Sequence, residues 1–313
     1  MSNQSIYPFS RFRGLDYPSV RRNTIDDELL FNLSYCNFEN NPFIPLDEFL
    51  QFSIIRGRLA KYQEAGLDIV VMTNEQVIAC GLAMKQRGRL FVSRSEYDYE
   101  VSDAWVSRIT QNLNDKFVWW ATNATSKDLR VKSLPYGLHD CHSWGDPHDV
   151  AGDIRLIAAF RAKQTQKLHT ITACFNVGNY PAERLPAHEV LSKRDDVTWI
   201  EPGGIIQSNI QQLCLYYEVL AKSRFVANPR GNGIDCNRFY EALYCGAIPI
   251  MLKQNVLKCH EDLPILILDT WSDLKDIDLR NEEDRIRSSH WNLGKLTSSY
   301  YVREIDLSYD SIF

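Results

Sequence analysis

Short apolar runs alternate with amphipathic stretches along most of the chain. Runs of strand length predict β-strands at residues 67–72, 89–93, 116–121, 169–175, 197–200, 224–227, 247–252 and 263–268. Apolar residues spaced by three and four predict helices at residues 45–65, 77–85, 102–112, 151–164 and 209–221. This alternation favours βαβ units and an α/β fold with parallel sheets, in which ligands bind beyond the carboxyl ends of the strands.

A polar stretch at residues 161–167 separates two such series of elements. We therefore predict two Rossmann-like domains facing across a cleft. Residues 1–164 form the first, residues 165–285 form the second, and residues 286–313 form a helical segment that crosses back to the first. By the strand-end rule, the first domain presents residues 73–76, 93–101 and 122–123 to a ligand.

The most informative stretch is residues 223–252, which predict a strand, a glycine loop, a helix and a second strand. Gly231 and Gly233 are expected to give the loop unusual backbone angles. Asp235 is the expected N-cap of the helix, and Gly246 is its expected stop signal.

The loop and the first helical turns predict an anion site. A helix N-terminus carries partial positive charge and free N–H donors. Arg238 stands in this first turn and Arg230 just before the glycines, an arrangement that a diphosphate would neutralise. Glu241 follows Arg238 by three residues and shares its helix face, so its carboxylate is a candidate partner for a ribose diol. An ordinary surface ion pair between Arg238 and Glu241 is the alternative interpretation.

Residues 229–250 read P-R-G-N-G-I-D-x-x-R-x-x-E-A-L-x-x-G-A-I-P-I. This pattern resembles the C-terminal signature of exostosin-like glycosyltransferases, which are inverting enzymes of the two-Rossmann-domain glycosyltransferase B fold. The resemblance implies a nucleoside diphosphate sugar as donor, with UDP-xylose, UDP-glucuronate, UDP-galactose and UDP-GlcNAc all open. It also implies a glycan acceptor and no requirement for a metal or other cofactor.

The resemblance assigns donor contacts to positions of this sequence. Asn176 and Arg184 match a strand, an Asn and a later Arg of the family, with a helix-surface arginine as the alternative for Arg184. The backbone that follows the short strand at 197–200 would meet the uracil. The complete predicted donor set is Asn176, Arg184, Trp199, Ile200, Glu201, Arg230, Gly231, Asn232, Gly233, Asp235, Arg238 and Glu241.

The N-terminal half resembles the family more weakly and must supply the catalytic base. The stretch LFVSRSEYDYEV is similar to a strand and a Ser-His-Asn-Ser-Asp-Tyr loop, although Arg94 and Ser95 replace the His and the Asn. Asp98 is the first candidate base, with Glu75 and His139 in reserve, because an inverting transfer requires a group that deprotonates the acceptor. A loop aspartate with a capping role is the alternative for Asp98.

Composition and charge indicate which partners, which cellular location and which state of the cysteines to expect. The 313-residue chain has a net charge of −5, which argues against nucleic acid as its main partner. No signal-like or membrane-spanning apolar run occurs in the sequence, so we expect a soluble enzyme of bacterial cytoplasm, or of host cytoplasm if a virus encodes it. The eight cysteines are scattered without a C-x-x-C pair, which favours reduced thiols over a disulfide framework.

The sequence gives little support to a zinc site, a P-loop or a dinucleotide-binding site. The loop HDCHSWGDPH at 139–148 has side chains that can bind zinc, but its spacing matches no strong zinc pattern. No lysine follows the glycines as a P-loop requires, and Cys236 replaces the third glycine of a dinucleotide fingerprint. Two functions remain open: a glycosyltransferase, and a non-catalytic protein of the same fold that binds a nucleotide sugar or a glycan.

Overall fold

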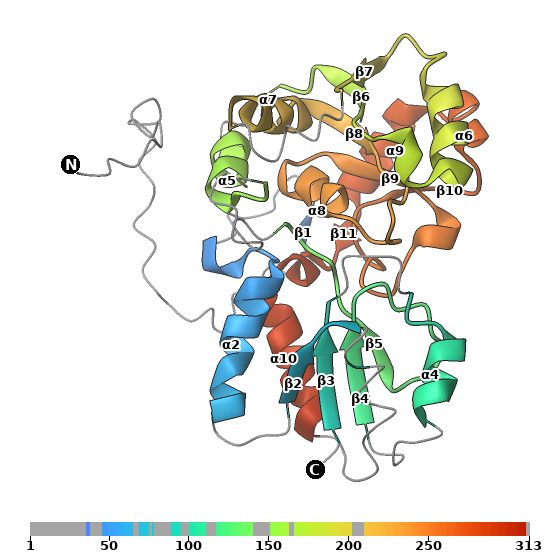
Figure 1. The fold of residues 1–313 in the computed structure, drawn as a ribbon. Coiled ribbons are helices and arrows are strands. Elements are labelled where there is room, and N and C mark those ends of the chain that lie inside the picture. The colour runs from blue at the N-terminus through green and yellow to red at the C-terminus, as the bar shows by residue number, and fades with distance from the viewer. Residues whose placement is uncertain are drawn as a thin grey trace, which may run out of the picture.

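The computed structural model describes residues 36–37, 46–64, 69–74, 77, 89–94, 100–110, 117–139, 151–162, 166–201 and 210–310. Its mixed α/β fold contains two parallel sheets (Figure 1), so the predicted fold class is confirmed at that level. The predicted helix at 77–85 lies outside the described residues except for Val77.

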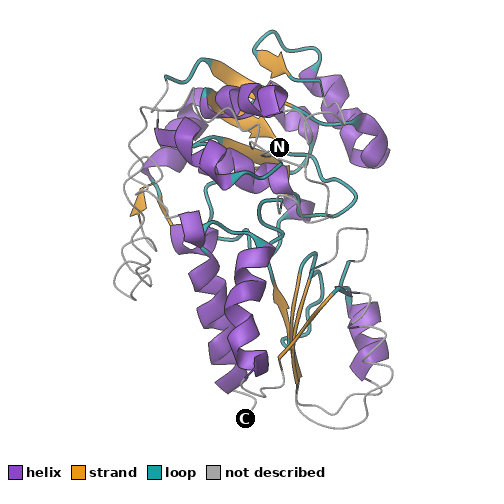
Figure 2. Ribbon diagram, turned by 60° about the vertical axis from the view of Figure 1, so that its left-hand side comes forward, coloured by secondary structure: helices purple, strands orange, loops and turns teal. Residues whose placement is uncertain are grey.

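The first sheet has four parallel strands in the order β2-β3-β4-β5. They are β2 (Ile69–Met72), β3 (Arg89–Ser93), β4 (Phe117–Ala121) and β5 (Val131–Ser133). Helix α4 (Asp103–Thr110) lies on one face of this sheet, and α2 (Phe52–Glu64) lies beside α10 (Ser298–Asp310) on the other (Figures 1 and 2). The strands follow one another in chain order, so this sheet has no reversal among its described strands.

The second sheet has five parallel strands in the order β10-β9-β8-β6-β7. They are β6 (His169–Ala173), β7 (Val197–Trp199), β8 (Ser223–Ala227), β9 (Ile248–Leu252) and β10 (Leu266–Leu268). The chain passes from β6 to β7 on one side and returns to β8 on the other side of β6. The strand order therefore reverses between β6 and β8, where α/β sheets bind their ligands.

The helices of this half are α5 (Ile154–Ala162), α6 (Pro181–Leu191), α7 (Ile210–Ala221), α8 (Asn237–Tyr244) and α9 (Leu279–Ser288). Helices α5, α7 and α8 pack together, whereas α6 packs against the 3₁₀ turn at Trp271–Lys275. The two-residue strands β1 (Cys36–Asn37) and β11 (His290–Trp291) pair antiparallel. Most predicted strands and helices thus occur within a few residues of their expected bounds, because each one buries an apolar run or an apolar face.

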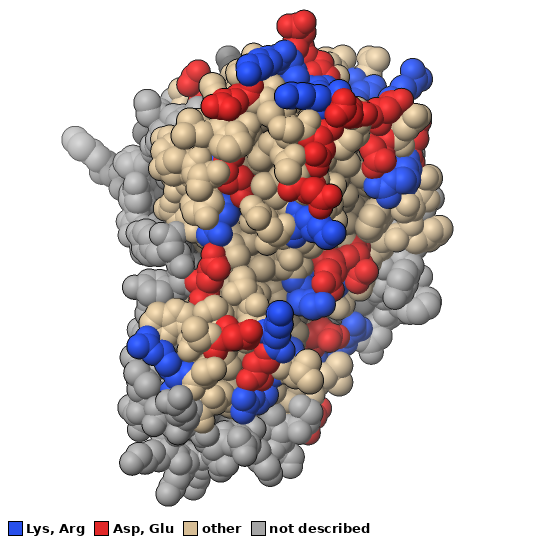
Figure 3. All heavy atoms as spheres, turned by 90° about the vertical axis from the view of Figure 1, so that its right-hand side faces the viewer, with Lys and Arg blue, Asp and Glu red and all other residues tan. Residues whose placement is uncertain are grey.

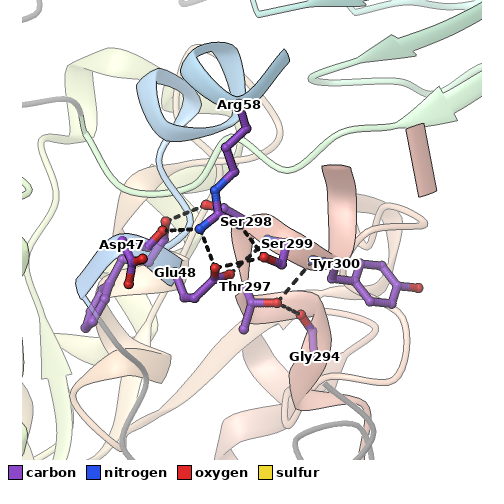
Figure 4. A network of polar contacts seen from close by, with 9 residues as sticks. Asp47, Glu48, Arg58, Gly294, Thr297, Ser298, Ser299 and Tyr300 are labelled. Atoms are coloured by element: carbon purple, nitrogen blue, oxygen red, sulfur yellow. Dashed lines mark hydrogen bonds and ion pairs between the residues drawn. The ribbon is translucent and has the colours of Figure 1, made fainter. Parts of the chain in front are cut away.

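The C-terminal helix α10 is fixed to the 3₁₀ turn Leu46–Glu48 by a buried carboxylate (Figure 4). Glu48, only 1% exposed, accepts a hydrogen bond from the backbone N–H of Ser299 at 3.0 Å and another from the Ser299 hydroxyl at 2.8 Å. The guanidinium of Arg58 contacts both the Glu48 carboxylate and the Ser299 hydroxyl. A negative charge at a helix N-terminus is stabilising, so Glu48 holds α10 against α2.

Tyr244, the last residue of helix α8, forms hydrogen bonds with two main-chain groups. The buried Tyr244 hydroxyl accepts from the Leu50 N–H at 2.8 Å and donates to the Leu296 carbonyl at 2.6 Å. It therefore satisfies two main-chain groups from opposite ends of the sequence.

Beyond Tyr244, Gly246 adopts a φ of +74° and ends the helix as predicted. Lys167 donates to the Gly246 carbonyl at 2.8 Å, and Arg161 donates to the Tyr244 carbonyl at 2.7 Å. Cations at a helix C-terminus offset its partial negative charge. Burial, followed by repulsion from Arg287, lowers the pKa of Lys167 to about 7.

None of the described helices is long and apolar enough to cross a bilayer. Within the described part of the chain, Cys174, Cys214, Cys236, Cys245 and Cys259 are not joined in disulfide bonds. The face seen in Figure 3 carries basic and acidic side chains interspersed with one another.

Candidate functional site

The candidate site lies where the strand order of the second sheet reverses. The segment after β6 brings Asn176 and the 3₁₀ turn Val177–Asn179 to the carboxyl edge of the sheet. The segment after β8 brings the loop 228–236 to the same edge, and α8 follows it. The predicted glycine loop therefore stands at the position where this sheet type binds ligands.

The loop glycines are explained by close approach to neighbouring side chains and not by backbone angle. Neither Gly231 nor Gly233 has a positive φ, so the expectation of unusual backbone angles is wrong. A Cβ at Gly233 would lie 2.9 Å from the amide nitrogen of Asn123, and one at Gly231 would lie 3.2 Å from Nη2 of Arg184. A side chain at Gly233 would displace the amide of Asn123, and one at Gly231 would require the guanidinium of Arg184 to shift by a few tenths of an ångström.

Arg184 belongs to this site and is not a surface residue of α6. It is 3% exposed, and it donates to the carbonyls of Arg230 at 2.7 Å and Asn176 at 2.6 Å. Burial, followed by repulsion from Arg238, lowers the pKa of Arg184 to about 10, so its guanidinium remains charged at neutral pH.

Arg230 connects the loop to the first half of the chain. Its guanidinium forms an ion pair with Glu100 at 3.0 Å and lies over the Tyr180 ring at 4.2 Å from the centroid. Its backbone N–H donates to the carboxylate of Glu183 at 3.1 Å. The side chain is therefore held in place at the edge of the site, with Nε buried and unbonded.

Several buried donors of this stretch have no acceptor. Nδ2 of Asn228, Nε of Arg230 and Nη1 of Arg238 are all buried and make no hydrogen bond within the described structure. Neither Arg184 nor Arg238 forms an ion pair with a described residue. Unpaired buried donors are costly, and a bound anion would supply the missing acceptors.

The neighbouring thiols do not neutralise this positive charge. Burial raises the pKa of Cys236, and burial also raises that of Cys174, so both remain protonated. The Cys236 thiol donates to the amide oxygen of Asn228 at 3.0 Å. The two thiols therefore contribute no negative charge beside Arg184 and Arg238.

Asp235 has a different role from the predicted one. The N-cap of α8 is Cys236, with no side-chain cap, so the capping assignment is wrong. The Asp235 carboxylate is buried and accepts from the Tyr136 N–H at 2.7 Å and from the Tyr240 hydroxyl at 2.7 Å. Its other oxygen lies 3.0 Å from Nε2 of His260. All of these partners are protein groups, so Asp235 positions the loop and is not an open ligand contact.

The same loop is fixed by a residue that follows β4 of the first sheet. The backbone N–H of Asp235 donates at 3.0 Å to the side-chain oxygen of Asn123, which is 1% exposed and has a φ of +54°. Asn237 donates to the carbonyl of Gly137 at 2.9 Å. Asn123, predicted to face a ligand as a strand-end residue, instead holds the loop.

Glu241 is also committed to protein partners. It is 8% exposed and accepts from the hydroxyls of Tyr216 at 2.8 Å and Tyr217 at 3.2 Å. Burial raises the pKa of Glu241. This position does not support the predicted ribose contact, nor does it support a surface ion pair with Arg238.

Trp199 is the exposed aromatic residue of this edge. It is 36% exposed at the end of β7, and its ring lies 5.5 Å from that of Phe175, over which Arg184 is placed. Ile200 continues the backbone pairing by donating to the Ala173 carbonyl at 2.9 Å. Glu201 and Asn232 are exposed, whereas Gly231 is buried.

Of the three predicted catalytic residues, the structure describes only His139. Asp98 and Glu75 lie outside the described residues, as do the residues 140–150 that contain most of the histidine loop. His139 is half-buried, and its carbonyl accepts from Gln51 at 2.8 Å.

A buried group of Asp235, Cys259 and His260 has the side-chain types of a metal site. However, Nδ1 of His260 accepts from the Leu257 N–H at 3.2 Å, so Nε2 carries the proton that is donated to Asp235. Because both ring nitrogens are engaged, these residues do not fit a metal in this arrangement.

Sequence reasoning missed the residues that hold the loop. Tyr136, His260 and Glu183 bond the loop from distant positions, and the two tyrosines of α7 bond Glu241 of α8. These residues belong to no recognisable motif. The sequence indicated such partners only through the clustering of Arg230, Asp235, Arg238 and Glu241 in one short stretch.

Neither the family models nor the curated proteins contain a match to this chain. The resemblance to exostosin-like glycosyltransferases therefore rests on residues 229–250 and on the weaker pattern of the N-terminal half.

Proposed function

We propose that the chain is an inverting, metal-independent glycosyltransferase of the exostosin-like type, which transfers a sugar from a UDP-sugar to a hydroxyl of a glycan. One observation carries this proposal. Three buried donors, on Asn228, Arg230 and Arg238, lack an acceptor at the strand-order reversal of a parallel sheet. A diphosphate supplies several acceptor oxygens and two negative charges at such an edge.

The donor in this proposal lies along the carboxyl edge of the second sheet. Its diphosphate is held by Arg184, Arg230, Arg238 and the N-terminus of α8. Its base lies against the backbone at 199–201, beside the exposed ring of Trp199. The first sheet forms the opposite wall, in the two-domain arrangement that the family resemblance implies.

The proposed reaction is a single displacement at the anomeric carbon. A carboxylate takes the proton of the acceptor hydroxyl, the new carbon–oxygen bond forms, and the bond to the diphosphate breaks with release of UDP. Asp98 is the proposed base. It precedes Glu100 by two positions, and Glu100 pairs with Arg230 at 3.0 Å. The arginines stabilise the charge that develops on the leaving group.

Calorimetry with UDP tests the donor site directly. We expect Arg238→Ala to weaken UDP binding roughly 100-fold, since a buried cation that meets a phosphate is lost. Arg280→Ala, at an exposed position of α9, is the matched control and should bind UDP as the unaltered protein does. No UDP binding by the unaltered protein, or unchanged binding by Arg238→Ala, would contradict the proposal.

Release of UDP from a panel of UDP-sugars tests the catalytic assignment. We expect slow hydrolysis of at least one donor, undiminished in EDTA, and its loss in Asp98→Asn. Binding of UDP without turnover of any donor would instead support the alternative, a non-catalytic protein that binds nucleotide sugars.

A further inference from the structure

The ion pair between Glu100 and Arg230 joins the first half of the chain to the loop 228–236. Oε1 of Glu100 lies 3.0 Å from Nη1 of Arg230, and the two side chains are 36% and 12% exposed. Glu100 is not part of the predicted donor set. A carboxylate therefore stands on a cation to which the proposed function assigns a diphosphate, and it needs a role of its own.

The main chain on both sides of this ion pair is fixed by Asn123. The N–H of Val101, the residue that follows Glu100, donates to the Asn123 carbonyl at 3.0 Å. The side-chain oxygen of Asn123 accepts from the N–H of Asp235, which belongs to the same loop as Arg230. The fold therefore holds the carboxylate at the loop, unlike an ion pair between two freely rotating surface side chains.

The surroundings of Arg230 restrict how an anion can approach it. The Tyr180 ring covers one face of the guanidinium at 4.2 Å from the ring centroid, and Nη2 donates to the Asn232 carbonyl at 3.2 Å. Guanidinium hydrogen bonds lie in the plane of the group, so a phosphate on Arg230 shares this plane with Glu100. Two acceptors on one guanidinium lie within about 8 Å of each other, which does not exceed the screening length at physiological salt.

Donor and product of the proposed reaction differ in charge at this point. The terminal phosphate of UDP carries close to two negative charges above about pH 7, whereas the same phosphate carries one when it is esterified to a sugar. Each unit charge at this distance from a carboxylate lowers affinity about threefold, even with the dielectric constant of water. Glu100 therefore disfavours the product more than the donor.

We propose that Glu100 promotes product release, because its carboxylate on Arg230 weakens the binding of free UDP more than that of the intact UDP-sugar. This inference rests on the proposed function and adds to it a residue that selects between donor and product by charge. Glu100 makes no contact with the reacting atoms in this scheme and acts through Arg230.

Calorimetric titration with UDP and with the β-methyl ester of UDP tests the inference, since the ester removes one charge from the terminal phosphate without adding a sugar. We expect Glu100→Gln to bind UDP about tenfold and the ester about threefold more tightly than the unaltered protein does, because the factor for two charges is the square of the factor for one. Gln retains an acceptor for Arg230, so the guanidinium keeps its position.

Two control variants separate charge from structure. Glu100→Asp keeps the charge and should bind neither ligand more tightly. Asp284→Asn removes the same charge at the opposite edge of the second sheet, where Asp284 lines a cavity with Thr170 and Arg224 near the amino ends of β6 and β8. It should leave both affinities unchanged.

A purely structural role of the ion pair predicts a different result. If Glu100 only held the loop in place, Glu100→Gln would weaken the binding of UDP and of its ester to the same extent. Weaker or unchanged binding of UDP by Glu100→Gln would overturn the inference, as would equal gains for UDP and the ester.

Inorganic pyrophosphate distinguishes a failure of this inference from a failure of the proposed function. If Glu100→Gln binds pyrophosphate more tightly while UDP binds no better than pyrophosphate and no UDP-sugar is turned over, Glu100 opposes anions at this loop and the glycosyltransferase proposal falls. If UDP binds and Arg238→Ala weakens it, but Glu100→Gln changes nothing, the glycosyltransferase proposal stands and the role of Glu100 is refuted.

Discussion

The buried carboxylate of Asp235 provides the sharpest test of how the loop is held. Its two oxygens accept from Tyr136, Tyr240 and His260, all three of which present a donor hydrogen. Asp235→Asn replaces one oxygen with an NH₂ group of almost the same shape. The change therefore alters hydrogen-bond polarity and leaves packing intact.

Neither orientation of the new amide satisfies these donors. If the NH₂ group faces Tyr136, it meets a backbone N–H that cannot become an acceptor. If it faces His260, the imidazole must move its proton to Nδ1, where it meets the N–H of Leu257. Each case leaves one buried donor unpaired, at about 1–3 kcal/mol, and removes the charge assistance of the remaining bonds. We estimate a loss of about 3 kcal/mol in the free energy of unfolding.

Urea unfolding followed by tryptophan fluorescence measures this loss, and a melting temperature lower by roughly 6 °C should accompany it. Asp269→Asn is the control, because Asp269 is exposed and its nearest cation lies 3.9 Å away. That substitution should change stability by less than about 0.5 kcal/mol. If Asp235→Asn remained within about 1 kcal/mol of the unaltered protein, the hydrogen-bond assignment would be refuted.

Three further predictions concern residues around the same helix and loop. Tyr244→Phe should lower the free energy of unfolding by about 2–4 kcal/mol, because it leaves the Leu50 N–H and the Leu296 carbonyl buried without a partner. Urea unfolding measures this loss, and a change under about 1 kcal/mol would show that the two hydrogen bonds contribute little. Lys167 has a pKa of about 7 in the folded protein against an ordinary value of 10.5, so the folded state binds fewer protons between these pH values and stability rises with pH across that window. Lys167→Met should remove this pH dependence of the unfolding free energy. If the unfolding free energies of the two proteins changed with pH in the same way, Lys167 would not be its source. Gly233→Ala should weaken UDP binding about tenfold by pushing the loop from Asn123, whereas Gly57→Ala, with open space around its Cβ, should leave binding unchanged in the same calorimetric assay.

The sequence by itself determined most of the local structure. Apolar runs of four to six residues bounded by polar or glycine positions became the parallel strands, because such strands are buried on both faces and carry a continuous apolar pattern. The end of α8 at Gly246 was equally readable, since a residue with a φ of +74° is favoured as glycine. These features depend on neighbours within a few positions.

The role of each charged residue was decided only by the tertiary structure. Asp235 resembles a helix cap in sequence, yet its partners Tyr136 and His260 lie 99 and 25 positions away. Glu241 resembles an exposed acid, yet α7 brings two tyrosine hydroxyls onto it. A carboxylate can be satisfied by many different donors, so local sequence cannot specify which of them the fold delivers.

The position of the site depends both on a local sequence pattern and on the tertiary structure. The glycine and arginine pattern of residues 229–250 predicts an anion-binding loop wherever that loop is placed. The order of the five strands, which reverses between β6 and β8, sets the loop beside Arg184 and leaves its buried donors without acceptors. Strand order depends on which distant segments pair and on how their helices pack, and these are long-range choices that no short stretch of sequence encodes.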